Sequence, residues 1–284
     1  MSEPLRSESD DHVRVITLTR ADEYNTINPG LRDALADALD AAEHDRRVHS
    51  VLLRAEGPAF CAGYQLDWAT AAQSDADASS ARVWDSVADA QMIGRYATTW
   101  AKLHTISKPT IAAVHGWCIA GGTNMVLNAD LIMCSESARF GYPPMRVWGI
   151  PEAPWVWIAR LGLERAKRYL FTGDEITGEE AAKLGLVLEC VADDQLDERS
   201  RDLAHRIARL PLEQLQMIKW ALNDTAREMY APDTSRMLGC LFDGVARHTQ
   251  EGLDFVARSV DVGFRQAVRE RDDPFGDYGS RPRT

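Results

Sequence analysis

A pair of glycines, Gly121–Gly122, stands where a helix is predicted to begin, and this placement could stabilise negative charge on an oxygen atom. The surrounding segment, residues 108–130, reads as a buried strand over 110–114, a turn, the glycine pair and a short helix. The first N–H groups of a helix have no partner inside it and lie at the positive end of its dipole. Such donors suit an oxyanion that develops during a reaction. Taken alone, a Gly-Gly pair is more typical of a tight turn that lets backbones pack closely.

A second glycine turn, upstream of the first, can supply another backbone donor. Residues 58–66 follow the apolar run Val51–Leu53 and read as a strand, a short turn at Gly63 and the start of a helix. The N–H of Tyr64 comes directly after that turn. The two turns therefore predict a pair of backbone donors.

The hydrophobic pattern places both turns in a chain of alternating strands and helices. Residues 13–56 read as strand, turn, helix and strand, and the helix over 31–44 carries Leu31, Leu35 and Leu39 on one face. Further elements are predicted in this order: an exposed or mobile segment over 69–82, a long amphipathic helix over 84–104, a constrained loop over 138–158, helices over 154–161, 164–171 and 177–184, a short strand over 186–188, and an almost wholly helical chain from 196 to about 270.

Composition sets the class of protein. With 284 residues, 45% hydrophobic and 26% charged, the chain is typical of a soluble globular protein. It contains no apolar run long enough to span a bilayer, and its first residues, MSEPLRSESDD, lack the apolar core of a secretory signal. The net charge of −11 disfavours nucleic acid as a partner. Five isolated cysteines predict neither a disulfide framework nor a zinc site, which favours a reducing, cytoplasmic location.

Five segments occur in an order that resembles the crotonase (enoyl-CoA hydratase/isomerase) superfamily. They are LTRADEYNTI, GPAFCAGYQL, KPTIAAVHGWCIAGGTNMVLNAD, ARFGYPPMRVWGIPEA and LFTGDEITGEEAAKLGLV, and they span roughly residues 13 to 190. The resemblance implies an α/β fold, a right-handed β/α superhelix with a C-terminal helical region. In the family these last helices cover the site and build a homotrimer or a dimer of trimers.

The resemblance also implies where an acyl-CoA substrate binds. By motif position, the backbone N–H groups of Tyr64 and Gly121 form the oxyanion hole for the thioester carbonyl. Coenzyme A is expected as part of the substrate, with no other cofactor and no metal. Because Asp22 stands where some relatives offer a basic residue, Arg20, or basic groups of the C-terminal helices such as Arg265 or Arg269, could bind the nucleotide phosphates instead. Further substrate contacts are expected from Tyr24, Ala62, Gln65, Leu66, Trp117 and Trp148.

The chain departs from the family at the two glutamates with which its hydratases hold and activate water. Asn124 and Pro144 occupy these places. An amide cannot act as a general base, and proline offers no functional side chain. Asn124 could still hold a water or a substrate oxygen, or could simply satisfy nearby backbone groups near a helix start. Hydration by the usual pair is therefore not expected.

Glu152 falls where divergent family members carry their sole acid. One carboxylate suffices for double-bond isomerisation, because it can take a proton from C2 and return it at C4. Nearby Trp148, Trp155 and Trp157 are predicted to raise its pKa toward neutrality by excluding water. In the alternative interpretation, Glu152 is a first-turn residue of a helix that begins at Pro151.

The resemblance predicts an enzyme of acyl-CoA and fatty acid metabolism, with isomerisation as the expected reaction and Glu152 and Asn124 as its catalytic side chains. Three alternatives stay open: a hydratase with non-standard water activation, a CoA-independent retro-Claisen hydrolase of β-diketones, and a non-catalytic acyl-CoA binder. The predicted organisation is a disordered leader (1–12), a spiral β/α core with the acyl-CoA site (13–195), a helical oligomerisation region (196–270) and a polar tail (271–284).

Overall fold

The computed structural model describes residues 3–65 and 85–278. Leu66, Trp84 and the segment 69–82, about which the sequence made predictions, lie outside the described residues. No helix in the described ranges is long and apolar enough to cross a membrane.

The larger of two sheets has six strands in the order β1-β2-β3-β5-β7-β10. Strand β1 pairs antiparallel with β2, and all later pairs are parallel. Residues in β3 and β5 are mostly buried on both faces, as the run of apolar side chains in a covered parallel sheet requires. The strands are β1 (Leu5–Asp10), β2 (Val13–Leu18), β3 (Ser50–Ala55), β5 (Thr110–Val114), β7 (Leu131–Ser135) and β10 (Glu189–Val191).

The smaller sheet explains why the chain winds as a spiral. Its order is β4-β6-β8-β9, with a final antiparallel pair. After β3, β5 and β7, the chain passes in each case directly to a strand of this second sheet, so each turn contributes one strand to either sheet. Its strands are β4 (Ala59–Cys61), β6 (Trp117–Ile119), β8 (Arg139–Gly141) and β9 (Ile176–Thr177).

Helices of the core pack against these sheets. In the first of them, Asn28 Oδ1 accepts the N–H of Leu31, and the predicted apolar face is fully buried. Every residue of the short helix α4 is buried, so its position is fixed on all sides. The helices are α1 (Pro29–His44), α3 (Ser86–Thr105), α4 (Gly121–Leu127), α5 (Trp155–Leu161), α6 (Leu163–Thr172) and α7 (Gly178–Leu184), with single 3-10 turns η1 (Ala21–Glu23), η2 (Pro143–Arg146) and η3 (Asp193–Gln195).

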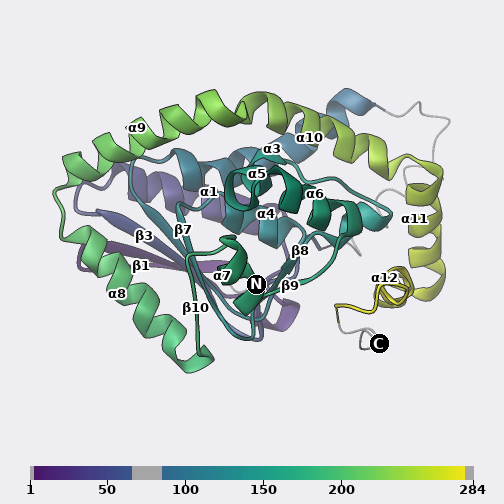
Figure 1. Ribbon diagram of the computed structural model, residues 1–284, viewed down its shortest axis with the longest axis horizontal. Coiled ribbons are helices and arrows are strands. Elements are labelled where there is room, and N and C mark those ends of the chain that lie inside the picture. Colours follow the sequence, from purple (N-terminus) through teal and green to yellow (C-terminus); the bar gives the residue numbers. More distant parts are fainter. Residues whose placement is uncertain (1–2, 66–84, 279–284) are drawn as a thin grey trace.

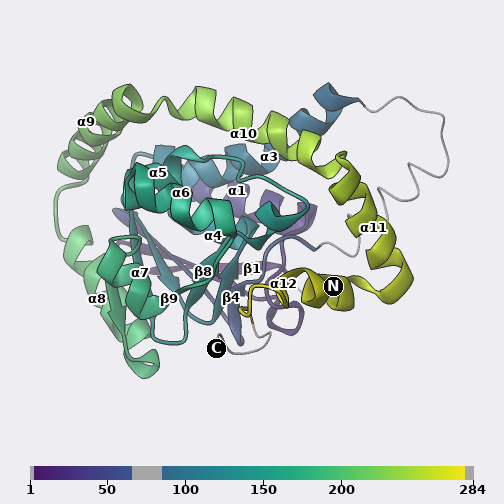
Figure 2. The same ribbon diagram turned by 45° about the vertical axis from the view of Figure 1, so that its right-hand side comes forward.

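The C-terminal helices form an arc around this core (Figures 1 and 2). Helix α8 packs on the large sheet, α9 and α10 run along one edge, and α11 turns down so that α12 returns toward the core. Helix α10 packs closely along α3. The helices are α8 (Leu196–Ala208), α9 (Leu212–Tyr230), α10 (Pro232–Arg247), α11 (Gln250–Val262) and α12 (Phe264–Asp272).

The predicted disordered leader is wrong, because residues 5–10 form strand β1. This strand pairs with β2 in register from Leu5 opposite Leu18 to Asp10 opposite Val13. Only Leu5 is buried, and the other side chains are exposed or nearly so. A hydrogen-bonded edge strand of this kind depends on backbone pairing, and its polar side chains resemble those of a disordered segment.

Two further predictions needed correction. The last strand occupies Glu189–Val191 instead of 186–188, because Leu186 and Val187 are buried in the turn that follows α7. The predicted loop over 138–158 contains the ordered strand β8 and the turn η2.

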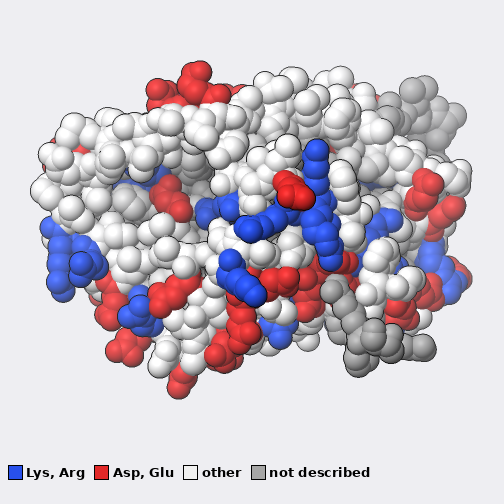
Figure 3. Space-filling view, in the orientation of Figure 1, with Lys and Arg blue, Asp and Glu red and all other residues white. Residues whose placement is uncertain are grey.

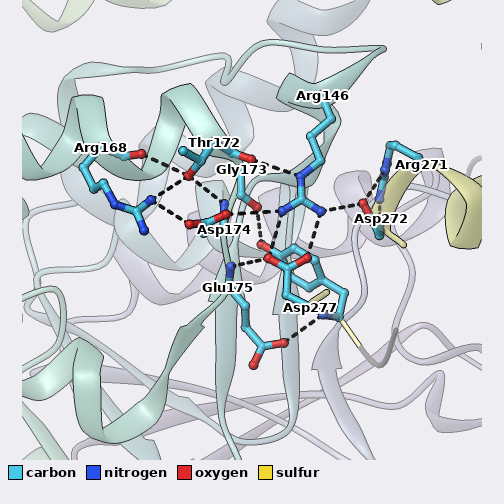
Figure 4. A network of polar contacts seen from close by, with 10 residues as sticks. Arg146, Arg168, Thr172, Gly173, Asp174, Glu175, Arg271, Asp272 and Asp277 are labelled. Atoms are coloured by element: carbon cyan, nitrogen blue, oxygen red, sulfur yellow. Dashed lines mark hydrogen bonds and ion pairs between the residues drawn. The ribbon is translucent and has the colours of Figure 1, made fainter. Parts of the chain in front are cut away.

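The polar tail also packs against the core where it follows α12. Arg146 in η2 binds the carboxylates of Asp272 and Asp277, and its guanidinium lies 3.8 Å from the ring centre of Phe275. Figure 4 shows this network, which we call the Arg146 clamp. The hydroxyl of Tyr278 donates to the carbonyl oxygen of Gly173 at 2.8 Å. The clamp holds the C-terminal segment against the spiral core.

Candidate active site

A cavity of about 760 Å³ lies between the spiral core and the C-terminal helices. Its wall includes residues of the η1 turn, the β4 turn, α3, the loop before α5, α10 and α12. Of the predicted substrate contacts, Tyr24, Ala62, Gln65, Trp117 and Trp148 all line it. The structure thus brings these five residues to one site, whereas the sixth, Leu66, is not described.

The two glycine turns meet at this cavity. Gly63 has φ +93°, and a Cβ atom there would lie 3.1 Å from the carbonyl oxygen of Ile119. Ala120, directly before α4, has φ +54°, a conformation that side-chain-bearing residues seldom adopt. Both Tyr64 and Ala120 line the cavity. The close approach of the two turns requires a glycine at position 63 and a strained backbone conformation at Ala120.

The N–H groups of Tyr64 and Gly121 are unoccupied by backbone acceptors within the described part of the chain. The first backbone bond of α4 runs from the N–H of Asn124 to the carbonyl of Ala120, which leaves the Gly121 amide in the unpaired first turn. Gly121 lies beneath the Tyr64 ring, since a Cβ atom on Gly121 would be 2.6 Å from Tyr64 Cε2. The structure therefore brings together the two predicted oxyanion-hole residues.

Glu152 is buried, with 2% of its surface exposed, and lines the same cavity. It lies in the loop before α5, so its interpretation as a first-turn helical residue is wrong. The hydroxyl of Tyr64 donates to Oε1, and Nδ2 of Asn124 donates to Oε2. Burial raises the pKa of Glu152 to about 7, although both hydrogen bonds oppose this rise. A carboxyl group with this pKa can both accept and release a proton near neutral pH.

Asn124 has a defined orientation. Its Oδ1 accepts a hydrogen bond from the indole N–H of Trp157 at 3.1 Å, so its amide NH₂ must face Glu152. The structure shows a contact that differs from both roles left open by the sequence: Asn124 donates a hydrogen bond to the carboxylate of Glu152.

The side chain of Tyr64 is a functional group that sequence reasoning missed. The sequence interpretation used only its backbone N–H. Burial, and then the negative charge of Glu152, raise the pKa of Tyr64 well above its ordinary value, which keeps the phenol protonated and able to donate. Its ring meets that of Tyr96 edge-on, with centres 5.3 Å apart. The available signal in the sequence was a tyrosine directly after Gly63, in one of the two turns predicted to form the oxyanion hole.

Helix α5 braces α4. Besides the bond from Trp157, Arg160 donates to the carbonyl oxygens of Leu127 and Ala129 at the C-terminal end of α4. A cation at this end complements the helix dipole. Burial nevertheless lowers the pKa of Arg160 to about 10. The helix that follows Glu152 is therefore hydrogen-bonded to α4 at its central residue, Asn124, and at and just beyond its C-terminal end.

Burial raises the pKa of Glu152, but the three tryptophans to which the sequence interpretation assigned this effect lie in different environments. Trp157 reaches Glu152 through Asn124. Trp155 packs against His104 and Tyr230, and Trp148 packs against Phe255.

Charged side chains lie on other parts of the cavity wall. Arg265 and Arg269 of α12, which the sequence proposed for nucleotide binding, line it and are exposed. Asp22 and Glu23 line it too, and Arg20 pairs with Glu23. Pro144, at the second family glutamate position, also lies on the wall.

Comparison with known proteins identifies close relatives of this arrangement. A family model described as enoyl-CoA hydratase/isomerase matches residues 8–258. A crystal structure of an enoyl-CoA hydratase from Mycobacterium smegmatis is 41% identical, with a TM-score of 0.91 over 98% of this chain and 96% of that one. The hydroxycinnamoyl-CoA hydratase-lyase of Pseudomonas fluorescens is 28% identical over 249 residues, 82% of this chain and 86% of the relative. The 1,2-epoxyphenylacetyl-CoA isomerase of Escherichia coli (strain K12) is 27% identical over 230 residues, 78% and 83% of the two chains. These likenesses confirm the predicted crotonase-like fold.

Proposed function

We propose that this chain, which belongs to the enoyl-CoA hydratase/isomerase family, moves a carbon–carbon double bond in an acyl-CoA thioester with Glu152 as its acid/base. The observation that carries the proposal is the buried carboxyl group of Glu152, held by Tyr64 and Asn124 on the cavity wall, with a pKa of about 7. At neutral pH such a group is present in both protonation states, so it can take a proton and give it back.

The reaction begins with a 3-enoyl thioester. The carboxylate of Glu152 removes a proton from C2, and the electron pair delocalises over C2 to C4 and the thioester oxygen. The new double bond forms between C2 and C3, and the protonated carboxyl returns its proton at C4. Atoms and charge balance without a further reactant. The donors on Glu152 keep the carboxylate aimed at the substrate in both steps.

The negative charge on the thioester oxygen needs donors that are already in place. The N–H groups of Tyr64 and Gly121 fit this role, because both lie in adjacent turns without a described backbone acceptor. Removal of one such donor typically lowers the rate about 10²–10³-fold.

Coenzyme A is proposed as part of the substrate, held through its phosphates. The support is the position of Arg265 and Arg269 on α12, exposed and on the cavity wall. A phosphate ester attracts guanidinium groups strongly even on a protein whose net charge is −11.

Hydration of a 2-enoyl thioester is the second candidate. It is favoured by the contact between Asn124 and Glu152, because the carboxylate could activate a water that the two side chains share. The solved structure that is 41% identical is named an enoyl-CoA hydratase. In this reaction Glu152 would take a proton from water as the hydroxyl adds at C3, and it would return that proton to C2 of the resulting enolate.

The decisive experiment supplies 3-enoyl-CoA and 2-enoyl-CoA separately in deuterated buffer, separates the products by chromatography and analyses them by mass spectrometry. We expect 3-enoyl-CoA to become 2-enoyl-CoA, and we expect Glu152→Gln to slow this conversion about 10²–10⁴-fold. A product that has gained one water from 2-enoyl-CoA, without isomerisation of 3-enoyl-CoA, would favour the hydratase.

Cleavage of a β-diketone and thermal stabilisation by acyl-CoA test the remaining alternatives. A retro-Claisen hydrolase would cleave a β-diketone and ignore both CoA esters. A non-catalytic binder would be stabilised thermally by acyl-CoA without turnover.

We further propose that the protein forms a homotrimer or a dimer of trimers in the cytoplasm. The support is a set of exposed apolar side chains on α9 and α10, and the edge of the molecule where these helices run is largely uncharged (Figure 3). These residues are Met217, Ile218, Trp220, Leu222, Met229 and Met237. Sedimentation velocity should give the mass of three or six chains, whereas a monomer at micromolar concentration would contradict this proposal.

A further inference from the structure

Helix α10 runs beside the loop that carries Glu152 and is hydrogen-bonded to both ends of it. Near the beginning of the helix, Ser235 Oγ accepts the N–H of Trp155 at 3.0 Å. Two turns later, Asp243 Oδ1 accepts the N–H of Ile150, also at 3.0 Å. The helix and the loop therefore run antiparallel, with Glu152 between the two bonds.

The middle of the helix touches the loop directly. A Cβ atom on Gly239 would lie 2.5 Å from the carbonyl oxygen of Glu152 and 2.6 Å from that of Pro151. Cys240 Sγ lies 4.0 Å from the same oxygen of Glu152. Only glycine allows the helix backbone to come this close.

The three contacts lie on one face of α10, because Ser235, Gly239 and Asp243 are spaced four residues apart. We propose that this α10 stripe is a positioning device for Glu152, which fixes the loop against α10 and keeps the carboxylate of Asp243 beside the reacting one. The inference rests on the proposed role of Glu152. It gives the C-terminal region a function in the chemistry of the site.

Charged groups from several elements face Asp243. On its own helix, Arg247 Nε lies 3.3 Å from Asp243 Oδ2. On α3, Asp89 pairs with Arg247 at 2.7 Å, and His248 lies 3.9 Å from Asp89. Burial raises the pKa of Asp243 to about 6, while Arg247 opposes this and Asp89 adds to it. At neutral pH Asp243 is therefore mainly ionised.

The negative charge of Asp243 affects the pKa of Glu152. Burial is the largest cause of the raised pKa of Glu152, and the negative charge of Asp243 raises it further. Among the described residues, the other titratable groups that affect Glu152 or are affected by it include Tyr64, which is half-buried, and Tyr142 and Cys240, which are buried. All three are protonated near neutral pH.

The first test removes the charge of Asp243 and keeps its size. With Asp243→Asn, the low-pH limb of kcat/KM, which reports the free enzyme, should move to lower pH by about half a unit or more. Asp202→Asn removes an exposed carboxylate on α8 and should leave the limb where it is. A lower rate with an unmoved limb would mean that Asp243 has only a structural role and would overturn this part of the proposal.

The carboxyl group of Glu152 can also be followed without substrate. Infrared difference spectra between the native protein and Glu152→Gln, recorded across pH, report the titration of Glu152 itself. The same pair of spectra in the Asp243→Asn background should show this titration at lower pH. This measurement separates the two proposals, since it succeeds or fails independently of which reaction the enzyme catalyses.

The second test moves the loop by one methyl group. Gly239→Ala should lower kcat about tenfold or more with a smaller change in KM, because the added methyl group displaces the loop and moves the carboxyl group of Glu152 away from its position facing the substrate. Gly94→Ala is the matched control, since a Cβ atom on this glycine of α3 would meet nothing within 4 Å. Equal activity of the two folded variants would overturn the positioning role. If Gly239→Ala does not fold, the position of the low-pH limb of kcat/KM in Asp243→Asn decides whether the proposal is right.

Discussion

Glu152 and Arg146 are both almost fully buried, but the protein surrounds them in opposite ways. The guanidinium of Arg146 meets the carboxylates of Asp272 and Asp277 at 2.8 Å each, with Asp174 at 3.6 Å (Figure 4). These partners keep its charge fixed, and they raise its pKa even though burial lowers it.

Glu152 is bonded to groups that carry no charge. Among the described residues its hydrogen-bond donors are the phenol of Tyr64 and the amide of Asn124. Because neither donor carries a positive charge that would offset the cost of burial, its pKa rises to about 7. The comparison teaches that opposite charges make a buried ion structural, whereas neutral donors leave a buried acid able to exchange its proton.

The largest effect is expected from the loss of the exchangeable acid. Glu152→Gln should lower kcat/KM for the isomerisation about 10²–10⁴-fold, the usual contribution of a positioned acid/base. The matched control is Glu180→Gln, because Glu180 also accepts a tyrosine hydroxyl, that of Tyr169 at 2.6 Å, outside the cavity. Steady-state kinetics should show near-native activity for the control. Comparable losses in both variants would show that any carboxyl–phenol pair matters for folding only.

Disruption of the Arg146 clamp should lower the stability of the folded protein. Arg146→Met leaves the buried carboxylates of Asp272 and Asp277 without their cation, and the free energy of unfolding should fall by about 3–5 kcal/mol. Arg258→Met breaks an exposed pair with Glu270 and should change it very little. Urea denaturation measures both. A clamp variant as stable as the Arg258 variant would remove the contrast between the two regions.

The next largest effect is the pH dependence of stability, which should distinguish the surroundings of Glu152 from those of Arg146. Folded Glu152 keeps its proton up to about pH 7, whereas the unfolded chain releases it near 4.5. The stabilising contribution is therefore complete below 4.5 and is lost as pH rises through 7, which amounts to about 3 kcal/mol. As the pH rises from 5 to 8, the free energy of unfolding of Glu152→Gln should therefore increase relative to that of the native protein. Denaturation at both pH values tests this, and a constant difference would mean that Glu152 is ionised throughout.

The smallest effect concerns one neutral donor. Asn124→Ala removes a hydrogen bond to the carboxylate and should raise the pKa of Glu152, so kcat/KM at neutral pH should fall about tenfold. The low-pH limb should move to higher pH, opposite in direction to the shift expected for Asp243→Asn. A pH–rate profile decides between the two directions. If Asn124→Ala abolishes activity at every pH while Glu152→Gln stays active, the proposed proton shuttle is wrong.

Much of the fold followed from local patterns in the sequence. The apolar spacing of Leu31, Leu35 and Leu39 predicted helix α1, because a helix that buries one face needs that spacing wherever it packs. The helix predicted over 177–184 begins with Thr177, a typical N-cap residue, whose Oγ1 accepts the N–H of Glu180. Both features depend on residues a few positions apart. Strand β1 escaped this reasoning, since its order comes from backbone pairing and leaves little trace in side chains.

The sequence by itself predicted which turns, which glycines and which acid lie together at the candidate site. It singled out Glu152 and the amides of Tyr64 and Gly121, because motif residues keep their order along the chain. Only the tertiary structure decided what surrounds that acid: a phenol 88 residues away in sequence, and a helix from the C-terminal region that lies against its loop. Proton exchange at Glu152 depends on burial and on the charge of its neighbours, and these are set by packing between distant segments, which no local pattern encodes.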